Sequence, residues 1–395
     1  MLRAYKYRIY PNKEQEQKFV KTFGCCRVVW NDCVNAFNSD YDVWTLENKY
    51  GIDVPNNYKK EYRTAKQMKE EFNWMSEVSS GALNYSIQNF RAYQNLKYKN
   101  YGKVGFPKFK NRHSKQSYSL QHPRFEIKEG KIRLEKIGWV KLVESQKINE
   151  DATYKSVTVS KNKANQYYVS VLVDTHIEQL PKTDKTVGID LGLKEFAVTS
   201  DNVHIDNPHF LRENQAKIKR LQMWQSKKVG SKKGQSKSRL WRRLQMRINK
   251  EYNRLYNRRL DFTHKLSTQM VKDYDIICLE DLAVDNLVKN HNLASAIADV
   301  KWGDFRRQIE YKCKWYGKEM MLVDRFYPSS KTCSCCGHIV DEMPLNVRMF
   351  ACPECGLTID RDYNAAMNIK QTCTGSTGIR PLSLEVTKDY EALTC

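Results

Sequence analysis

Two cysteine pairs constrain the fold of this chain more than any other feature of its sequence. The pairs form the pattern C-x2-C-x15-C-x2-C, and a glycine follows each pair. Their members are Cys333, Cys336, Cys352 and Cys355. This spacing is typical of a ribbon in which four thiolates bind one structural zinc ion and leave no open position for water. Cys335 fits neither pair, so we expect it to be a spare thiol, and we expect His338 to lie beside the site without binding the metal. Cysteines clustered in this way favour metal binding in a reducing compartment over disulfides.

The charge of the chain points to a polyanionic partner. Its 395 residues include 67 Lys and Arg against 45 Asp and Glu, which gives a net charge of +22. Self-repulsion on this scale favours nucleic-acid binding over the alternative of a merely basic enzyme. No segment approaches the roughly 18–20 apolar residues of a membrane span. Charged residues in the first ten positions also interrupt any signal peptide, so we expect a cytoplasmic protein with access to chromosomal DNA.

Two basic stretches are candidates for contact with that partner. Residues 212–259 hold 17 Lys and Arg but only two acids, and Gly230–Gly234 divides the stretch into an expected helical hairpin. A face of one sign suits a phosphate backbone better than solvation, which is the alternative. A second stretch, Lys97–Lys115, mixes basic and aromatic residues, and its alternative is a charged linker. The residues that we expect to contact nucleic acid are Lys227, Lys228, Lys232, Lys233, Arg242, Arg243, Arg247, Arg254, Lys108 and Lys110.

The remaining patterns predict a multidomain chain of mixed α and β structure. Residues 4–10 alternate like a strand, and Pro11-Asn12 then opens a helical region that reaches about Tyr98 with a loop near Tyr50–Asn57. Residues 117–175 read as short strands that share a sheet with the first strand. After a linker at residues 181–185 the pattern becomes α/β. The tail after Lys370 has no amphipathic period, so we expect it to be mobile.

Three isolated acids stand out on hydrophobic elements of the α/β part. Asp190 lies in the apolar strand 187–193, and Glu280 ends the apolar strand 276–280. Strand alternation sends Asp281 to the opposite face from Glu280, so at most one of them belongs to a shared site. Asp362 lies at a helix start that Asp360 is placed to cap. Carboxylates in apolar surroundings need a partner or a metal, and three of them can hold the two Mg²⁺ ions of a phosphodiesterase. The alternative is that each acid is merely capped or paired.

Several motifs in a fixed order resemble TnpB, the family of transposon-encoded RNA-guided DNA nucleases to which type V CRISPR effectors are similar. They are Tyr5–Pro11, Phe23–Arg27, Gly188–Gly192, Leu279–Leu282, Trp302–Arg306, Glu310–Lys312, the cysteine ribbon and Arg361–Ala366. The resemblance covers roughly residues 1–370. The extra Cys335 departs from the pattern and bears only on which cysteines bind the zinc.

The resemblance implies a domain order. It implies a β-barrel-like wedge domain over residues 1–10 and 117–182, split by a helical recognition domain over 11–116. A RuvC-like nuclease domain of RNase H fold follows at 183–327 and 358–370, with the basic helical insertion at 212–259. A zinc ribbon at 328–357 interrupts it, and residues 371–395 form the tail.

The resemblance also implies an activity. The family's nuclease acids fall on Asp190, Glu280 and Asp362, which are the acids that the residue patterns select, and they would bind Mg²⁺. A guide RNA from the transposon end would pair with double-stranded target DNA beside a short adjacent motif, and one RuvC-like site would cut the DNA. The alternatives are an RNA-guided repressor that does not cleave and a transposase that joins strands itself.

Overall fold

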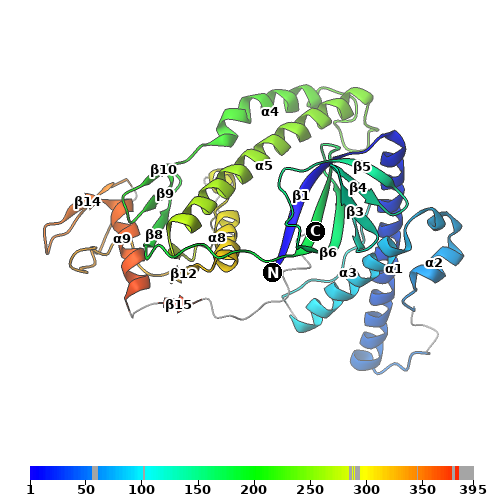
Figure 1. Cartoon of the computed structure of the whole chain (residues 1–395), viewed down its shortest axis with the longest axis horizontal. Helices are drawn as coiled ribbons and strands as arrows, with labels where there is room; N and C mark the ends of the chain where they lie inside the picture. The colour runs from blue at the N-terminus through cyan, green and yellow to red at the C-terminus, as the bar shows by residue number, and fades with distance from the viewer. Residues whose placement is uncertain are drawn as a thin grey trace. The chain divides into compact units, whose positions relative to one another are not determined.

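The computed structural model describes residues 1–55, 61–100, 103–283, 287, 289, 294–344, 346–375 and 379–381. The described residues divide into two compact units, residues 1–176 and residues 177–381. Figure 1 shows their helices and strands. Among the described residues, no helix combines the length and the apolar character needed to cross a membrane.

The first unit consists of a seven-stranded antiparallel sheet and a group of helices. The sheet has the order β2-β6-β7-β1-β5-β4-β3, so the N-terminal strand shares a sheet with the later strands, as the sequence predicts, and lies at its centre. Its elements are β1 (Leu2–Tyr10), α1 (Lys13–Tyr50), α2 (Ala65–Glu71), η2 (Asn73–Glu77), α3 (Ser80–Lys99), β2 (Gln116–Gln121), β3 (Phe125–Lys128), β4 (Lys131–Leu134), β5 (Gly138–Val143), β6 (Thr153–Lys161) and β7 (Tyr167–Asp174).

Local signals set the boundaries of the long helix α1. The side chain of Asn12 accepts a hydrogen bond from the backbone of Gln15, and the side chain of Gln15 accepts one from the backbone of Asn12, which forms a capping box. Gly51 ends the helix in the left-handed conformation. Phe19 and Phe90 are fully buried in the core that α1 and α3 share with one face of the sheet. The predicted helical and β segments therefore pack around one hydrophobic core.

The second unit is built on a six-stranded mixed sheet of order β10-β9-β8-β11-β12-β15. Strand β11 lies parallel to both β8 and β12, whereas the remaining pairs are antiparallel. The elements are β8 (Thr186–Leu191), β9 (Glu195–Thr199), β10 (His204–Asp206), α4 (Phe210–Ser226), α5 (Arg239–Asp273), β11 (Ile276–Glu280), α7 (Ala294–Val300), α8 (Trp302–Tyr316), β12 (Glu319–Val323), β13 (Met349–Ala351), β14 (Thr358–Asp360), α9 (Arg361–Thr374) and β15 (Ile379–Pro381).

Helices cover both faces of this second sheet. Val187 and Leu279 belong to a buried cluster with Val271 of α5 and Phe305 of α8. On the other face, Cys278 packs with Ile369 of α9. The orange helix α9 lies across β8 in Figure 1. Both faces of the central strands are thus buried, which explains their continuous apolar sequences.

Two helices extend beyond the segments that the sequence patterns mark, and the expected start of the tail after Lys370 is wrong. Helix α5 continues past residue 259 to Asp273, because Met270 and Val271 add an apolar stripe that packs against the sheet. Helix α9 continues past Lys370 to Thr374, because Ile369 and Cys373 anchor its last turns. Residues 379–381 of the expected mobile tail pair with β12 as β15. The expected tail residues 376–378 and 382–395 lie outside the described residues.

Candidate functional site

Asp190 and Glu280 lie side by side because their strands are parallel neighbours. Ile189 of β8 is the register partner of Leu279 of β11, so the next residues, Asp190 and Glu280, lie level with each other. Residues of one register level point to the same side of a sheet. The two carboxylates therefore lie on the same face of the sheet, at the carboxyl ends of β8 and β11.

Helix α9 brings the third acid, Asp362, to the same place. A Cβ atom added to Gly188 would lie 2.2 Å from the carbonyl oxygen of Ala366 and 2.5 Å from the amide nitrogen of Lys370. The helix therefore lies directly on the backbone of β8. The four residues from Ala366 back to Asp362 span about 6 Å along the helix, and the two residues from Gly188 to Asp190 span a similar length along the strand. Asp362 therefore lies near Asp190.

Burial and the carboxylates of Glu280 and Asp362 together act on the pKa of Asp190. Burial raises the pKa of Asp190 well above its usual range, and the carboxylates of Glu280 and Asp362 raise it further. Burial also raises the pKa of Glu280, an effect that a hydrogen bond from the hydroxyl of Ser329 reduces. Neighbouring carboxylates in a partly dry site disfavour one another's charge. A cation among them would reverse this effect.

Asp281 lies on the opposite face, as alternation predicts. Its carboxylate accepts hydrogen bonds from Arg306 of α8 at 2.6 Å and from Arg325 at 2.8 Å. Burial, the largest single influence, acts to raise the pKa of Asp281, but the two guanidinium groups together outweigh it and lower that pKa. Asp281 is thus a paired structural acid, and it is separate from the three clustered acids.

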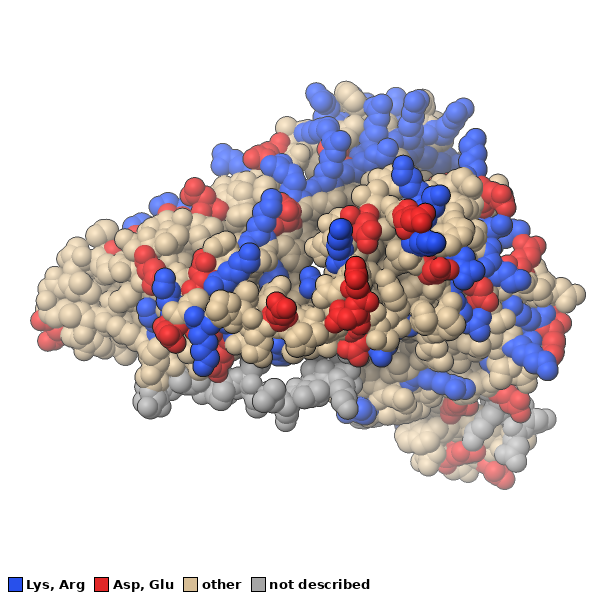
Figure 2. Space-filling model, viewed as in Figure 1, with Lys and Arg blue, Asp and Glu red and all other residues tan. Residues whose placement is uncertain are grey.

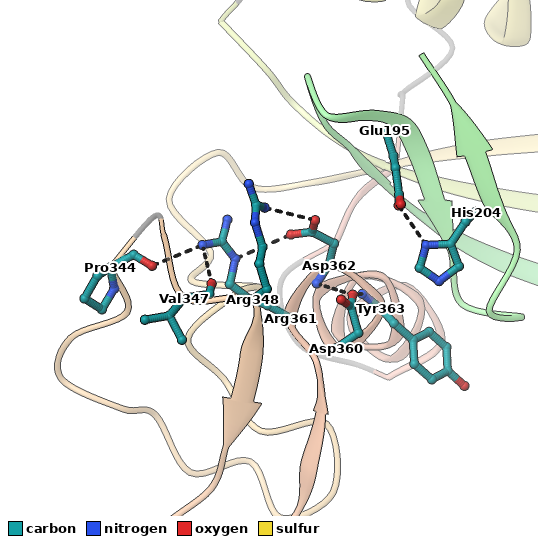
Figure 3. A network of polar contacts seen from close by, with 9 residues as sticks. All are labelled: Glu195, His204, Pro344, Val347, Arg348, Asp360, Arg361, Asp362 and Tyr363. Carbon is teal, nitrogen blue, oxygen red and sulfur yellow. Dashed lines mark hydrogen bonds and ion pairs between the residues drawn. The ribbon is translucent and has the colours of Figure 1, made fainter. Parts of the chain in front are cut away.

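Two arginines surround the carboxylate of Asp362 (Figure 3). Arg348 and Arg361 each lie 3.4 Å from one of its oxygens. The guanidinium of Arg361 also donates to the carbonyl oxygens of Pro344 and Val347. Asp360 caps α9 by accepting hydrogen bonds at 2.9 Å from the backbone of Asp362 and of the residue after it, which confirms the expected cap.

The sequence patterns did not identify the residues that fix α9 in place. Asn364 and Asn368 are buried, and both donate to the carbonyl oxygen of Thr332. Asn368 also donates to the carbonyl oxygen of Ser329, whose side chain holds Glu280. Two asparagines four residues apart on the apolar side of a helix are a usable signal for such a role, because buried amides need partners.

The four paired cysteines converge as their spacing predicts. All four sulfur atoms lie within 4.8 Å of one another. The sulfur of Cys333 lies 3.6 Å from that of Cys355, and the sulfur of Cys336 lies 3.5 Å from that of Cys352. Tetrahedral zinc–thiolate bonds of about 2.3 Å place sulfurs about 3.8 Å apart, so the cluster could bind a metal ion of this kind. Cys335 and His338 are not in the cluster.

Glycines shape both turns of the cysteine ribbon. Gly337 and Gly356 have φ values of 78° and 73°, and their amides donate to the carbonyl oxygens of Cys333 and Cys352. Only glycine adopts this left-handed conformation without strain. Phe350 is fully buried and packs in one cluster with Cys333 and Cys352.

The basic stretch of the second unit forms the expected hairpin of α4 and α5. Lysines and arginines gather over these two helices in Figure 2. Four expected contact residues line a groove of about 490 Å³ together with the exposed Trp224. They are Lys227, Lys228, Arg243 and Arg247. Arg254, in contrast, lies 3.6 Å from Glu251 and is partly neutralised. The structure places Lys232 and Lys233 in the connection between the helices, and Arg242 on α5.

The second basic stretch is docked on the helices of the first unit. Phe106 packs against Phe37 and Tyr41, so this aromatic ring has a structural role. Lys108 and Lys110 follow it, and both are exposed as whole residues, although the ammonium of Lys110 lies over the ring of Trp30. Whether each predicted residue contacts nucleic acid stays a prediction, as do the catalytic roles of the three acids.

Comparison with known families and structures agrees with this architecture. Three family models match, described as "Helix-turn-helix domain" over residues 1–42, "Probable transposase" over 166–291 and "Cas12f1-like, TNB domain" over 302–369. A Cas12f1 chain in a solved complex with its guide RNA and target DNA has a TM-score of 0.50 at 15% identity, with 94% of this chain and 98% of that chain covered. The fold and the cysteine cluster thus define a multidomain protein of Cas12f-like architecture.

Similarity to relatives of known family identifies the family to which this chain belongs. A protein of Streptomyces pristinaespiralis named "Putative RNA-guided DNA endonuclease" is 35% identical over 96% of this chain and 92% of its own length. The Escherichia coli protein named "Putative RNA-guided DNA endonuclease InsQ" is 28% identical over 93% of this chain and 91% of its own length. The chain belongs to the TnpB family, whose transposase model is called OrfB_IS605.

Proposed function

We propose that this protein is the RNA-guided DNA endonuclease of a transposon and that a single RuvC-like site cuts the target. The proximity of Asp190 to both Glu280 and Asp362, at the carboxyl ends of strands β8 and β11, carries the proposal. The names of its relatives support the same activity. The mixed sheet with α5, α8 and α9 is then the nuclease domain, and the cysteine ribbon is its zinc-binding insertion.

The donor set fits Mg²⁺. Hard divalent cations prefer carboxylate oxygens, and burial together with mutual repulsion raises the pKa of Asp190 in a way that a cation would relieve. Asp190, Glu280 and Asp362 would hold the metal. Two bound Mg²⁺ ions supply an activated water and charge stabilisation for the leaving oxygen.

Neighbouring side chains keep the three carboxylates in position. Ser329 donates to Glu280 and fixes the orientation of its carboxylate. Arg348 and Arg361 hold Asp362 by ion pairs. In hydrolysis, water adds to the phosphorus of one phosphodiester as the bond to the leaving oxygen breaks, and that oxygen takes up a proton. Residues that hold the carboxylates limit the reorganisation needed for this reaction.

The basic surfaces suit the two nucleic-acid partners. The hairpin of α4 and α5 and the segment with Lys108 and Lys110 would contact the backbones of the guide RNA and the target DNA. Base pairing would choose the target, and the protein would read a short adjacent motif. The guide would come from the transposon end, as the family membership suggests.

Conservative substitutions at the acids test the proposal. Asp190→Asn, Glu280→Gln and Asp362→Asn should each lower Mg²⁺-dependent cleavage of a guide-matched duplex by at least about a thousandfold. Guide-RNA and target binding should stay within about twofold of wild type. Asp281→Asn is the matched control, because this neighbouring acid lies on the other face and is bound to two arginines.

The outcomes separate the proposal from its alternatives. Wild-type cleavage without strand joining supports the nuclease, whereas joined products would indicate a transposase. Guided binding without any cleavage would indicate a repressor. A Glu280→Gln variant that cuts normally beside an inactive Asp281→Asn variant would reverse the assignment of these two acids.

A further inference from the structure

A crevice in the first unit has the properties of an anion site. It lies among α1, α3, β2 and the segment before β2, and its volume is about 60 Å³. One water molecule needs about 10–15 Å³ of such a cavity, so the crevice has room for several water molecules or for one small anionic group. Arg27, Lys110 and Lys115 line it, and the lining includes no acidic residue.

The cations of the crevice lack compensating carboxylates. Among the residues that the structure describes, none of the three forms an ion pair with an acid. Partial burial lowers the pKa of Lys110 to about 8, and the charge of Lys115 contributes to this lowering. Burial and the charge of Lys115 also lower the pKa of Lys6 on β1. Positive charges held together in this way favour the binding of an anion.

The position of Lys110 is fixed before any ligand arrives. The amide side chain of Asn31 on α1 accepts a hydrogen bond from the backbone nitrogen of Lys110 at 2.7 Å and donates to its carbonyl oxygen at 2.9 Å. The indole of Trp30 donates to the carbonyl oxygen of Lys108. The ammonium of Lys110 lies 3.5 Å from the centre of the Trp30 ring. Backbone and side chain are thus both held against α1.

One residue of the crevice lining carries a buried hydroxyl without a partner. Tyr118 of β2 is only 5% exposed, and its buried hydroxyl has no hydrogen-bond partner in the described structure. Burial keeps the pKa of Tyr118 well above its usual range, so the phenol remains a neutral donor. Unsatisfied buried hydroxyls are rare in proteins.

We infer that this crevice binds one backbone phosphate of a bound nucleic acid, held by Arg27, Lys110 and Lys115. The inference rests on the proposed function, which supplies the polyanion, and adds to it a defined contact in the first unit. The phosphate could belong to the guide RNA or to the target DNA, because the two backbones share this chemistry.

Charge-neutral variants test the inference by binding alone. The full-length Lys110→Gln/Lys115→Gln and Arg27→Gln variants are titrated without Mg²⁺ at several salt concentrations. The two probes are the RNA that co-purifies with the wild-type chain and a short double-stranded DNA. Each variant should bind one probe about tenfold more weakly. For each phosphate that is no longer neutralised, the slope of log K against log salt should fall by about 0.7 for single-stranded RNA or about 0.9 for duplex DNA.

The matched control is Lys128→Gln. Lys128 lies on β3, at the opposite edge of the sheet from β2, and its side chain is 66% exposed. The control variant should bind both probes like wild type. The melting temperature of the Lys110→Gln/Lys115→Gln variant should match or exceed the wild-type value, because the substitutions relieve the repulsion between these two lysines. Arg27→Gln should melt like wild type.

The outcomes are distinct. Weaker binding confined to RNA assigns the phosphate to the guide, and weaker binding confined to DNA assigns it to the target. Three results would overturn the inference. The crevice variants could show unchanged affinity and slope on both probes, they could bind more weakly without a change of slope, or Lys128→Gln could weaken binding equally. If the wild-type chain binds neither probe, both this inference and the proposed function fall. If it binds through the crevice but does not cleave, only the proposed nuclease activity fails.

Discussion

Two neighbouring acids in partly buried parts of this protein each have a specific hydrogen-bonding or ion-pair partner. Asp281 and Glu280 are neighbours in sequence, yet one is bound to two arginines and the other accepts a hydrogen bond from a serine hydroxyl. Strand alternation alone predicts their separation. It does not predict the partners, because Arg306, Arg325 and Ser329 come from distant elements. The sequence therefore identifies the clustered acids but not the side chains that orient them.

Lys312 provides a residue-scale prediction about pH. It is 5% exposed on α8, and its ammonium donates to the carbonyl oxygen of His264 and the hydroxyls of Ser267 and Thr268. Burial lowers its pKa to about 8, against about 10.4 in an unfolded chain. Between these values the unfolded state binds more protons, so the contribution of Lys312 to stability rises with pH.

Replacing this lysine should remove that pH dependence. At pH 7 the free energy of unfolding of Lys312→Met should exceed that of wild type. This advantage of the variant should shrink by up to about 3 kcal/mol as the pH rises from about 8 to about 10.5, because the wild-type protein becomes more stable over this range. Urea denaturation at a series of pH values measures both curves. A difference that does not vary with pH would show that Lys312 keeps an ordinary pKa in the folded protein.

At the scale of elements, the structure depends on how closely α9 approaches β8. The sequence shows the small residues Ala365 and Ala366, which predict a close approach, and Gly188 supplies the matching gap on the strand. The cysteine spacing likewise predicts the ribbon. The lengths of α5 and α9 are harder to predict from the sequence, because tertiary contacts of Val271 and Ile369 stabilise their last turns.

Gly188→Ala should separate the helix from the strand. The added methyl group would overlap the backbone of Ala366 and Lys370, which cannot rotate away as a side chain can. We expect the stability to fall by about 1–3 kcal/mol and cleavage to fall by about a hundredfold or more, because Asp362 moves with its helix. Gly303→Ala is the control. Nothing lies within 4 Å of its added methyl group, so its stability should stay level or rise slightly. Normal cleavage by Gly188→Ala would contradict the close packing.

The ribbon predicts one zinc ion per chain. Freshly purified protein should contain one equivalent by elemental analysis, and Cys352→Ser should lose the metal and lower the unfolding temperature, because metal binding contributes directly to the folding of such sites. Cys335→Ser should retain the zinc, since that thiol lies outside the cluster. Equal zinc loss in both variants would mean that the four ligands are wrongly assigned.

At the scale of the whole molecule, the fold is predicted from the pattern of apolar residues, whereas the kind of partner is predicted from the net charge. Alternation and apolar runs predict the mixed architecture and the sharing of one sheet by the first strand and the later ones. Pairing order is harder to derive, because β1 takes β5 and β7 as neighbours although both strands lie more than about 125 residues further along the chain. The net charge of +22 predicts the kind of partner without locating the contacts. Intramolecular ion pairs such as that of Lys217 with Glu251 are visible only in the structure.

The hairpin of α4 and α5 gives a prediction about this charge. Four of the five lysines of its connection can be replaced with glutamine without breaking any ion pair among the described residues. They are Lys227, Lys228, Lys232 and Lys233. If they contact phosphates, the quadruple variant should bind guide RNA or heteroduplex more weakly whatever the sequence. The slope of log K against log salt should fall by roughly 0.7 to 0.9 for each phosphate that is no longer neutralised. Guide-matched target choice should persist, because pairing reads the sequence.

A matched variant separates phosphate binding from a general decrease in positive charge. The ammonium of Lys217 already lies 2.8 Å from the carboxylate of Glu251, so Lys217→Gln should change the salt slope little. If the hairpin is only a solvated face, the quadruple variant will also leave affinity and slope unchanged. In that event the same titration with Arg242, Arg243, Arg247 and Arg254 replaced by glutamine decides for the helix α5 itself. Arg254 should contribute least, because Glu251 already offsets part of its charge.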